Sequence, residues 1–204
     1  DHAAWVRATV YQNADQDSLA SRLWSRLAQD TSSVYAEEAL YELAALAAQN
    51  GDLDSLYRIN RTVNVLRIRE RREEFKLLLA ETLAESGQHA EAVESLMDLA
   101  VNSAHTVSGR IAREELDSYD ENYAHRPRTQ TQRELEREFE ALSKNGKFDW
   151  SFDRVAAGYA RPDWQLQNDL LSFYKGRFES GLSRHRAAIQ DLKNHRSAYP
   201  QSAF

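Results

Sequence analysis

The 204-residue chain has no cysteine, three prolines and seven glycines. Without cysteine, disulfides, thiolate metal sites and cysteine nucleophiles are excluded. Sheet proteins place many glycines and prolines in their turns, so their scarcity favours long helices over strands. No run approaches the ~20 apolar residues of a membrane-spanning helix. A net charge of −6 does not suit general nucleic-acid binding, because cationic side chains must neutralise the phosphates.

Apolar residues recur at helical spacing on both sides of two glycines, Gly51 and Gly87. These glycines stand 36 residues apart, and each follows a predicted helix of about four turns. Ser32 and Ser33 are predicted to cap the helix before Gly51. A helix–turn–helix unit of fixed period buries its apolar stripe by stacking on its neighbours, which predicts a repeat architecture.

The repeat around Gly87 resembles a tetratricopeptide repeat (TPR). Ala80 and Gly87 match the small and turn positions of that repeat's first half, and Ala92 and Leu96 match the small and large positions of its second half. In the repeat around Gly51, Leu56 and Asn60 stand where the family prefers alanine and an aromatic residue. The resemblance implies an all-α fold of antiparallel helix–turn–helix repeats, stacked as a short right-handed α-solenoid. Two further turns are predicted, at 144–148 and 174–181, which makes the period irregular.

We expect one helical repeat region over residues 1–204, cut from a longer chain. Leading helices are predicted at 1–31, the two clearest repeats at 32–104, irregular helices at 105–161 and a last helical pair at 162–204. Pro127 predicts a helix boundary in the irregular middle. The aromatic segment between Gly146 and Pro162 is predicted to form a short helix.

No pattern in the sequence predicts catalysis, a cofactor or a metal site. The histidines lack the i, i+4 spacing of a helical zinc motif, so we interpret all six as solvated surface residues. Glutamate–serine pairs occur, as in the helical bacterial lytic transglycosylases that this composition resembles. The segment that follows the catalytic glutamate in that family is missing, so we interpret these pairs as chance. The chain by itself is therefore predicted not to be an enzyme.

Three basic clusters are candidate partner surfaces: Arg67, Arg69, Arg71 and Arg72; Arg126, Arg128, Arg133 and Arg137; and Arg184, His185, Arg186, Lys193, His195 and Arg196. They are interpreted either as solvated faces balanced by glutamates or as a basic strip for an acidic protein, lipid headgroup or polysaccharide. The four tryptophans, Trp5, Trp24, Trp150 and Trp164, are interpreted mainly as packing residues. The possible partner-binding residues are Tyr57, Arg69, Arg72, Tyr119, Tyr123, Arg126, Arg128 and Trp150.

These patterns predict a non-catalytic scaffold whose concave face holds a peptide or helix of another protein. The ending at 198–204 resembles the inter-repeat turns of bacterial envelope repeat proteins, which implies a periplasmic or outer-membrane-associated assembly. A cytoplasmic signalling module is a third possibility. The alternative function is a helical accessory domain of a larger protein that processes or secretes cell-wall material or polysaccharide.

Charge reversal at Arg69 and Arg72 tests the basic-strip hypothesis. If this strip binds an acidic partner, affinity capture with the variant is expected to recover a changed set of proteins with a weaker dependence on salt. An unchanged set with unchanged salt sensitivity would end the hypothesis.

Overall fold

The structure, a computed structural model, describes residues 1–30, 32–65, 71–125, 127–159 and 168–204. Over these ranges the chain forms eleven α-helices and no strand, which confirms the predicted all-α class. No helix in these ranges is both long and apolar enough to cross a membrane. The helices are α1 (His2–Asn13), α2 (Asp17–Gln29), α3 (Ala36–Gln49), α4 (Leu53–Val65), α5 (Arg72–Glu85), α6 (His89–Asn102), α7 (Val107–Tyr123), α8 (Gln132–Lys144), α9 (Phe148–Tyr159), α10 (Asn168–Gly181) and α11 (His185–Ala198).

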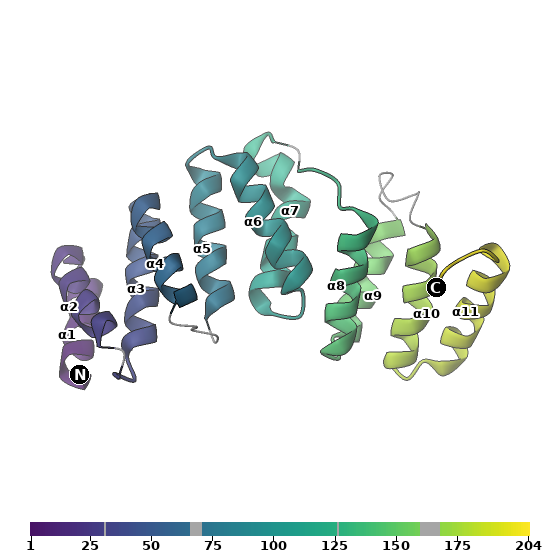
Figure 1. The fold of residues 1–204 in the computed structure, drawn as a ribbon, viewed down its shortest axis with the longest axis horizontal. Helices are drawn as coiled ribbons and strands as arrows, with labels where there is room; N and C mark the ends of the chain where they lie inside the picture. Colours follow the sequence, from purple (N-terminus) through teal and green to yellow (C-terminus); the bar gives the residue numbers. More distant parts are fainter. Residues whose placement is uncertain (31, 66–70, 126, 160–167) are drawn as a thin grey trace. The chain divides into compact units, whose positions relative to one another are not determined.

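The chain divides into two compact units, Asp1–Leu96 and Met97–Phe204, and the division falls within α6. In the first unit, helices that are consecutive in the sequence pack on one another from α1 to α5, and α3 also contacts α5. In the second unit the same holds from α8 to α11, with a further contact between α8 and α10. Figure 1 shows these runs of neighbouring helices within each unit. Most packing is therefore local in sequence.

Five helix pairs are joined by three-residue connections with one shared geometry: α1–α2, α3–α4, α5–α6, α8–α9 and α10–α11. The middle residue of each connection has a positive φ between 54° and 78°: Asp15, Gly51, Gly87, Gly146 and Ser183. The next residue's amide donates to the carbonyl five residues earlier, over 2.8–3.0 Å. This backbone pattern is the Schellman motif, which ends a helix and reverses the chain.

The turn predicted at 174–181 is wrong. Gly176 and Gly181 lie within α10, and the chain reverses at Ser183 instead. A Cβ atom on Gly176 would stand 2.7 Å from Cγ of Leu192, so this glycine permits close approach of α11 rather than a turn. The turn residues stand 36 residues apart from 15 to 51 and from 51 to 87, and 37 apart from 146 to 183, whereas 59 residues separate 87 from 146.

Two positions around each left-handed residue are buried in all five pairs. The position seven residues before holds Ala8, Ala44, Ala80, Phe139 and Gly176, and the position five residues after holds Ala20, Leu56, Ala92, Ser151 and Ala188. Seven of these ten residues are alanine or glycine, so most of the paired helices meet through small side chains. Small residues were expected at Ala80 and Ala92, and the structure shows that equivalent positions are also buried in the other helix pairs.

The N-terminal core contains Trp24, which is 1% exposed, and partly buried Trp5 packs against it. The predicted cap of α3 is wrong in its position. The helix begins at Ala36 after Tyr35, while the Ser33 hydroxyl accepts a bond from the Tyr35 amide and Ser32 bonds to Asp30. Trp164 and Pro162 lie outside the described residues.

The predicted boundary around Pro127 and the predicted short aromatic helix are confirmed. Pro127 lies in the connection between α7 and α8, and α9 is the short helix. α8 begins with a capping box in which Thr131 and Glu134 bond reciprocally.

A buried charged network ties α7, α8 and α9 together in the second unit. Glu138 of α8 is 2% exposed. Its Oε2 accepts bonds from Arg113 of α7 at 2.9 Å and from Gln130 at 2.8 Å, and its Oε1 accepts one from Nε of Arg154 on α9 at 3.1 Å. Arg154 also donates to Gln130 and lies 3.4 Å from Asp117. One carboxylate therefore joins three helices.

Glu138→Gln is expected to destabilise the protein by about 3–5 kcal/mol, because it leaves buried guanidinium groups without their counter-charge. Burial raises the pKa of Glu138, but the charges of Arg113 and Arg154 and the hydrogen bonds it accepts hold it below the ordinary value of 4.5. The stabilisation is therefore present above pH 4.5 and is lost as the pH falls through the lowered pKa.

Urea unfolding followed by circular dichroism, at neutral and acidic pH, measures both effects. The variant should be less stable at neutral pH and lose less stability on acidification. Glu140→Gln, at an exposed position of α8 paired with Lys144, is the control and is expected to cost under about 0.5 kcal/mol. Equal stability of wild type and Glu138→Gln at neutral pH would contradict the prediction.

Candidate peptide-binding groove

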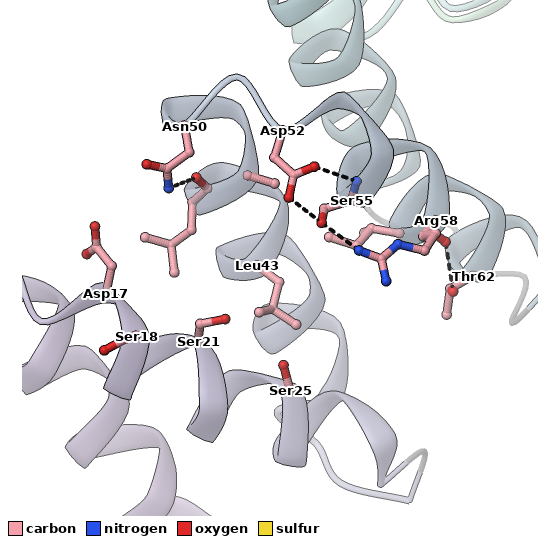
Figure 2. Close-up of a pocket in the computed structure, with 13 residues that line it drawn as sticks. Asp17, Ser18, Ser21, Ser25, Leu43, Asn50, Asp52, Ser55, Arg58 and Thr62 are labelled. Carbon is pink, nitrogen blue, oxygen red and sulfur yellow. Dashed lines mark hydrogen bonds between the residues drawn. The ribbon is translucent and has the colours of Figure 1, made fainter.

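A hollow of about 500 Å³ lies in the first unit, with α2 and α4 as walls and α3 as floor (Figure 2). We call it the α2–α4 groove. Its floor carries apolar side chains and its walls carry hydroxyl, amide and charged groups. The lining residues are Asp17, Ser18, Ser21 and Ser25 from α2; Leu43, Leu46 and Ala47 from α3; Asn50 and Asp52 from the turn; and Ser55, Arg58, Ile59 and Thr62 from α4.

The α2 wall is a line of three serines, Ser18, Ser21 and Ser25. Their i, i+3, i+7 spacing places them on one face of the helix. The other side of α2 is apolar and buries Trp24 and Leu27 in the core, which holds the serine face toward the groove. In Figure 2 the hydroxyls of Ser21 and Ser25 point into the hollow.

These serine hydroxyls make no hydrogen bond to any residue that the structure describes. A hydroxyl within a helix either bonds to the carbonyl four residues earlier or points away to solvent. That bond forms at six other helical hydroxyls: Thr9, Thr62, Thr82, Ser118, Ser151 and Ser197. Ser21 and Ser25 lack this bond and are partly exposed, so their hydroxyls are open to solvent or to a ligand in the groove.

The α4 wall holds an arginine in place through a short chain of hydrogen bonds. Asp52 accepts bonds from the amide and hydroxyl of Ser55, at 3.0 and 2.6 Å, and these bonds lower the pKa of Asp52. The Ser55 hydroxyl in turn accepts a bond from Nη2 of Arg58 at 2.8 Å. Nη1 of Arg58 has no partner among the described residues, so one edge of the guanidinium is available to a ligand.

The groove can satisfy an extended polypeptide backbone. Hydroxyls both donate and accept, so Ser21 and Ser25 can pair with either peptide amides or carbonyls. They are about 6 Å apart along the helix axis. Groups on one side of an extended chain repeat every ~6.6 Å, which is close to that spacing. The apolar floor of Leu43 and Ala47 offers a surface for one side chain of such a segment.

The predicted partner-binding residues do not gather at this groove. Tyr57 is 43% exposed on α4, beside Arg58, and its hydroxyl donates to Glu91 at 2.9 Å. Arg72 is exposed at the start of α5. Arg67, Arg69 and Arg126 lie outside the described residues.

The other predicted residues lie in the second unit. Tyr119 is fully buried, with its ring 4.7 Å from that of Tyr123. Trp150 is partly buried beneath the ammonium of Lys147, which lies 4.6 Å from a ring centroid. Arg128 donates twice to Glu134, and these bonds, with those from Thr131, lower the pKa of Glu134 to about 2. The paired Arg128 thus stabilises the start of α8.

Two basic-cluster residues have internal roles. Arg71 stacks on Tyr41, with its guanidinium carbon 3.6 Å from the ring centroid, and pairs with Glu38 and Glu74. His195 is 4% exposed between Phe173 and Tyr199, with Nε2 3.6 Å from Asp169. The interpretation of His195 as a solvated histidine is therefore wrong, since it faces α10 from the inner side of α11.

Sequence reasoning missed the groove. A signal was present in the i, i+3, i+7 spacing of Ser18, Ser21 and Ser25, which marks a polar helix face of small residues. The identity of the opposing helix was not readable from this spacing.

Within the described ranges, no three histidine, cysteine, aspartate or glutamate side chains are grouped as metal ligands would be. Comparisons with protein-family models, curated proteins and solved structures find no match to this chain.

The double variant Ser21→Ala, Ser25→Ala is expected to raise stability by about 0.5–1 kcal/mol. Alanine is the better helix former, and no hydrogen bond to a described residue is lost. Thr131→Ala, which removes a hydroxyl that caps α8, should instead lower stability by about 1 kcal/mol. Chemical denaturation measures the free energy of unfolding of both variants. A clear loss of stability in the serine variant would mean that these hydroxyls serve the fold.

Proposed function

We propose that this chain is a protein-binding scaffold of the tetratricopeptide type, and that its α2–α4 groove holds an extended segment of another protein. The observation that carries the proposal is the pair of unused hydroxyls on Ser21 and Ser25, facing an apolar floor and an oriented Arg58. Such groups cost stability on their own helix and are useful when a ligand pairs with them.

The repeated helix pairs support the architectural part of the proposal. The same Schellman turn recurs at intervals of 36 residues through positions 15, 51 and 87, and of 37 residues from 146 to 183. Small residues recur twelve positions apart across it, as at Ala8 and Ala20 or Ala80 and Ala92. Repeats of this kind stack into solenoids that present long binding surfaces. We therefore propose a right-handed TPR-like solenoid.

An extended ligand suits the groove better than a helix. A helix 10–12 Å across would fill about 500 Å³ with roughly one turn. Its backbone groups are already paired internally, so the serine hydroxyls would gain few partners. An extended segment brings unpaired amides and carbonyls to both walls.

The proposed setting in a bacterial envelope assembly rests on the resemblance of residues 198–204 to envelope repeat turns.

A groove-filling variant tests this function. Random peptides displayed on phage are selected against the wild-type chain, and the enriched peptides are synthesised. Ser21→Tyr is expected to weaken their binding by at least about tenfold, because the ring occupies the hollow. Gln29→Tyr adds the same ring to the exposed end of α2, outside the groove, and should bind as wild type does. Fluorescence anisotropy gives the Kd values.

Two outcomes would contradict the proposal. In one, no peptide is enriched. In the other, the enriched peptides bind Ser21→Tyr and wild type equally, which would place their binding elsewhere on the chain.

A further inference from the structure

The α2–α4 groove carries opposite charges on its two walls. Asp17, the first residue of α2, lies toward the Asn50 end of the hollow, and Arg58 of α4 lies toward the Thr62 end (Figure 2). The third charged residue of the lining, Asp52, already has both oxygens bonded to Ser55. The two charges left to a ligand are therefore one carboxylate and one guanidinium.

Asp17 is exposed and has no hydrogen-bond or ionic partner among the described residues. Its place in the first turn of α2 is favourable for a carboxylate, because the amino end of a helix carries partial positive charge. Its side chain is free to accept bonds from an ammonium or guanidinium group of a ligand.

Arg58 is pre-oriented for a carboxylate. Ser55 accepts a bond from Nη2 while Nη1 stays open, which orients the guanidinium along the α4 wall and lowers the side-chain entropy lost on binding. Exposed Arg61, one turn further on α4, lines an adjoining hollow together with Arg58 and adds positive charge on this side. Tyr57 and Asn64 also line that hollow.

We propose that the groove selects by charge and polarity an extended segment that carries a basic side chain facing Asp17 and, a few residues along, an acidic side chain facing Arg58. This rests on the proposed function, since it specifies the partner segment that the groove binds. The serines pair with the backbone of the segment and set its conformation, while the two charges fix its direction along α2.

The test uses the peptides enriched on the wild-type chain. Each is resynthesised with its acidic residue changed to the amide, or its basic residue changed to glutamine. Kd values are measured at about 50 mM and about 500 mM salt. Either change should weaken binding about threefold to tenfold at low salt, and less at high salt.

Variants of the groove should separate the two charges. Arg58→Gln should remove the preference for the acidic residue and leave the preference for the basic one. Asp17→Asn should do the reverse. Arg7→Gln, an exposed arginine of α1 outside the groove, and Asp149→Asn, an exposed first-turn aspartate of α9, are matched controls that should change neither preference.

The outcomes distinguish this inference from the function beneath it. Failure to enrich any peptide would overturn both. Peptides that Ser21→Tyr blocks but that tolerate both charge replacements would overturn the inference and leave the groove as a binding site. The inference would also be overturned if Arg58→Gln or Asp17→Asn weakened the binding of charged and neutral peptides equally. It would be overturned too if the control variants Arg7→Gln and Asp149→Asn changed the charge preferences to the same extent.

Discussion

The backbone hydrogen bond that closes each helix pair is the constraint on which the rest of the structure depends. In five connections an amide reaches the carbonyl five residues earlier, and this requires one residue in the left-handed region. The reversal brings small residues of the two helices into one core, such as Ala8 of α1 and Ala20 of α2. The positions of α2, α3 and α4 follow from two of these turns and from the core that α2 and α3 share, and so the groove follows as well.

Much of the helical order was readable from the sequence because three of the five turns use glycine at the left-handed position. Gly51, Gly87 and Gly146 mark their turns plainly. The first and last turns were not predicted, because Asp15 and Ser183 adopt the same conformation without that signature. The turn predicted at 174–181 was wrong because Gly176 lies within α10, where it permits close packing against α11 and does not reverse the chain.

The candidate site was harder to read than the fold. It depends on serines from α2 facing a different helix, and helical periodicity shows which residues share a face but not what that face meets. Clustered arginines were more visible in the sequence, yet Arg71 and Arg128 are paired with carboxylates of their own unit. Arg154, in no cluster, became part of a buried network. Local charge density alone does not separate internal ion pairs from binding surfaces.

Asp15 gives the groove a property of its own. A residue with a side chain in the left-handed region costs about 1 kcal/mol more than glycine, and the α1–α2 turn carries this cost at Asp15. The α2 wall of the groove belongs to this hairpin. A ligand that bridges α2 and α4 would clamp this hairpin shut, and its occupancy would be recorded as slower amide exchange along α1 and α2.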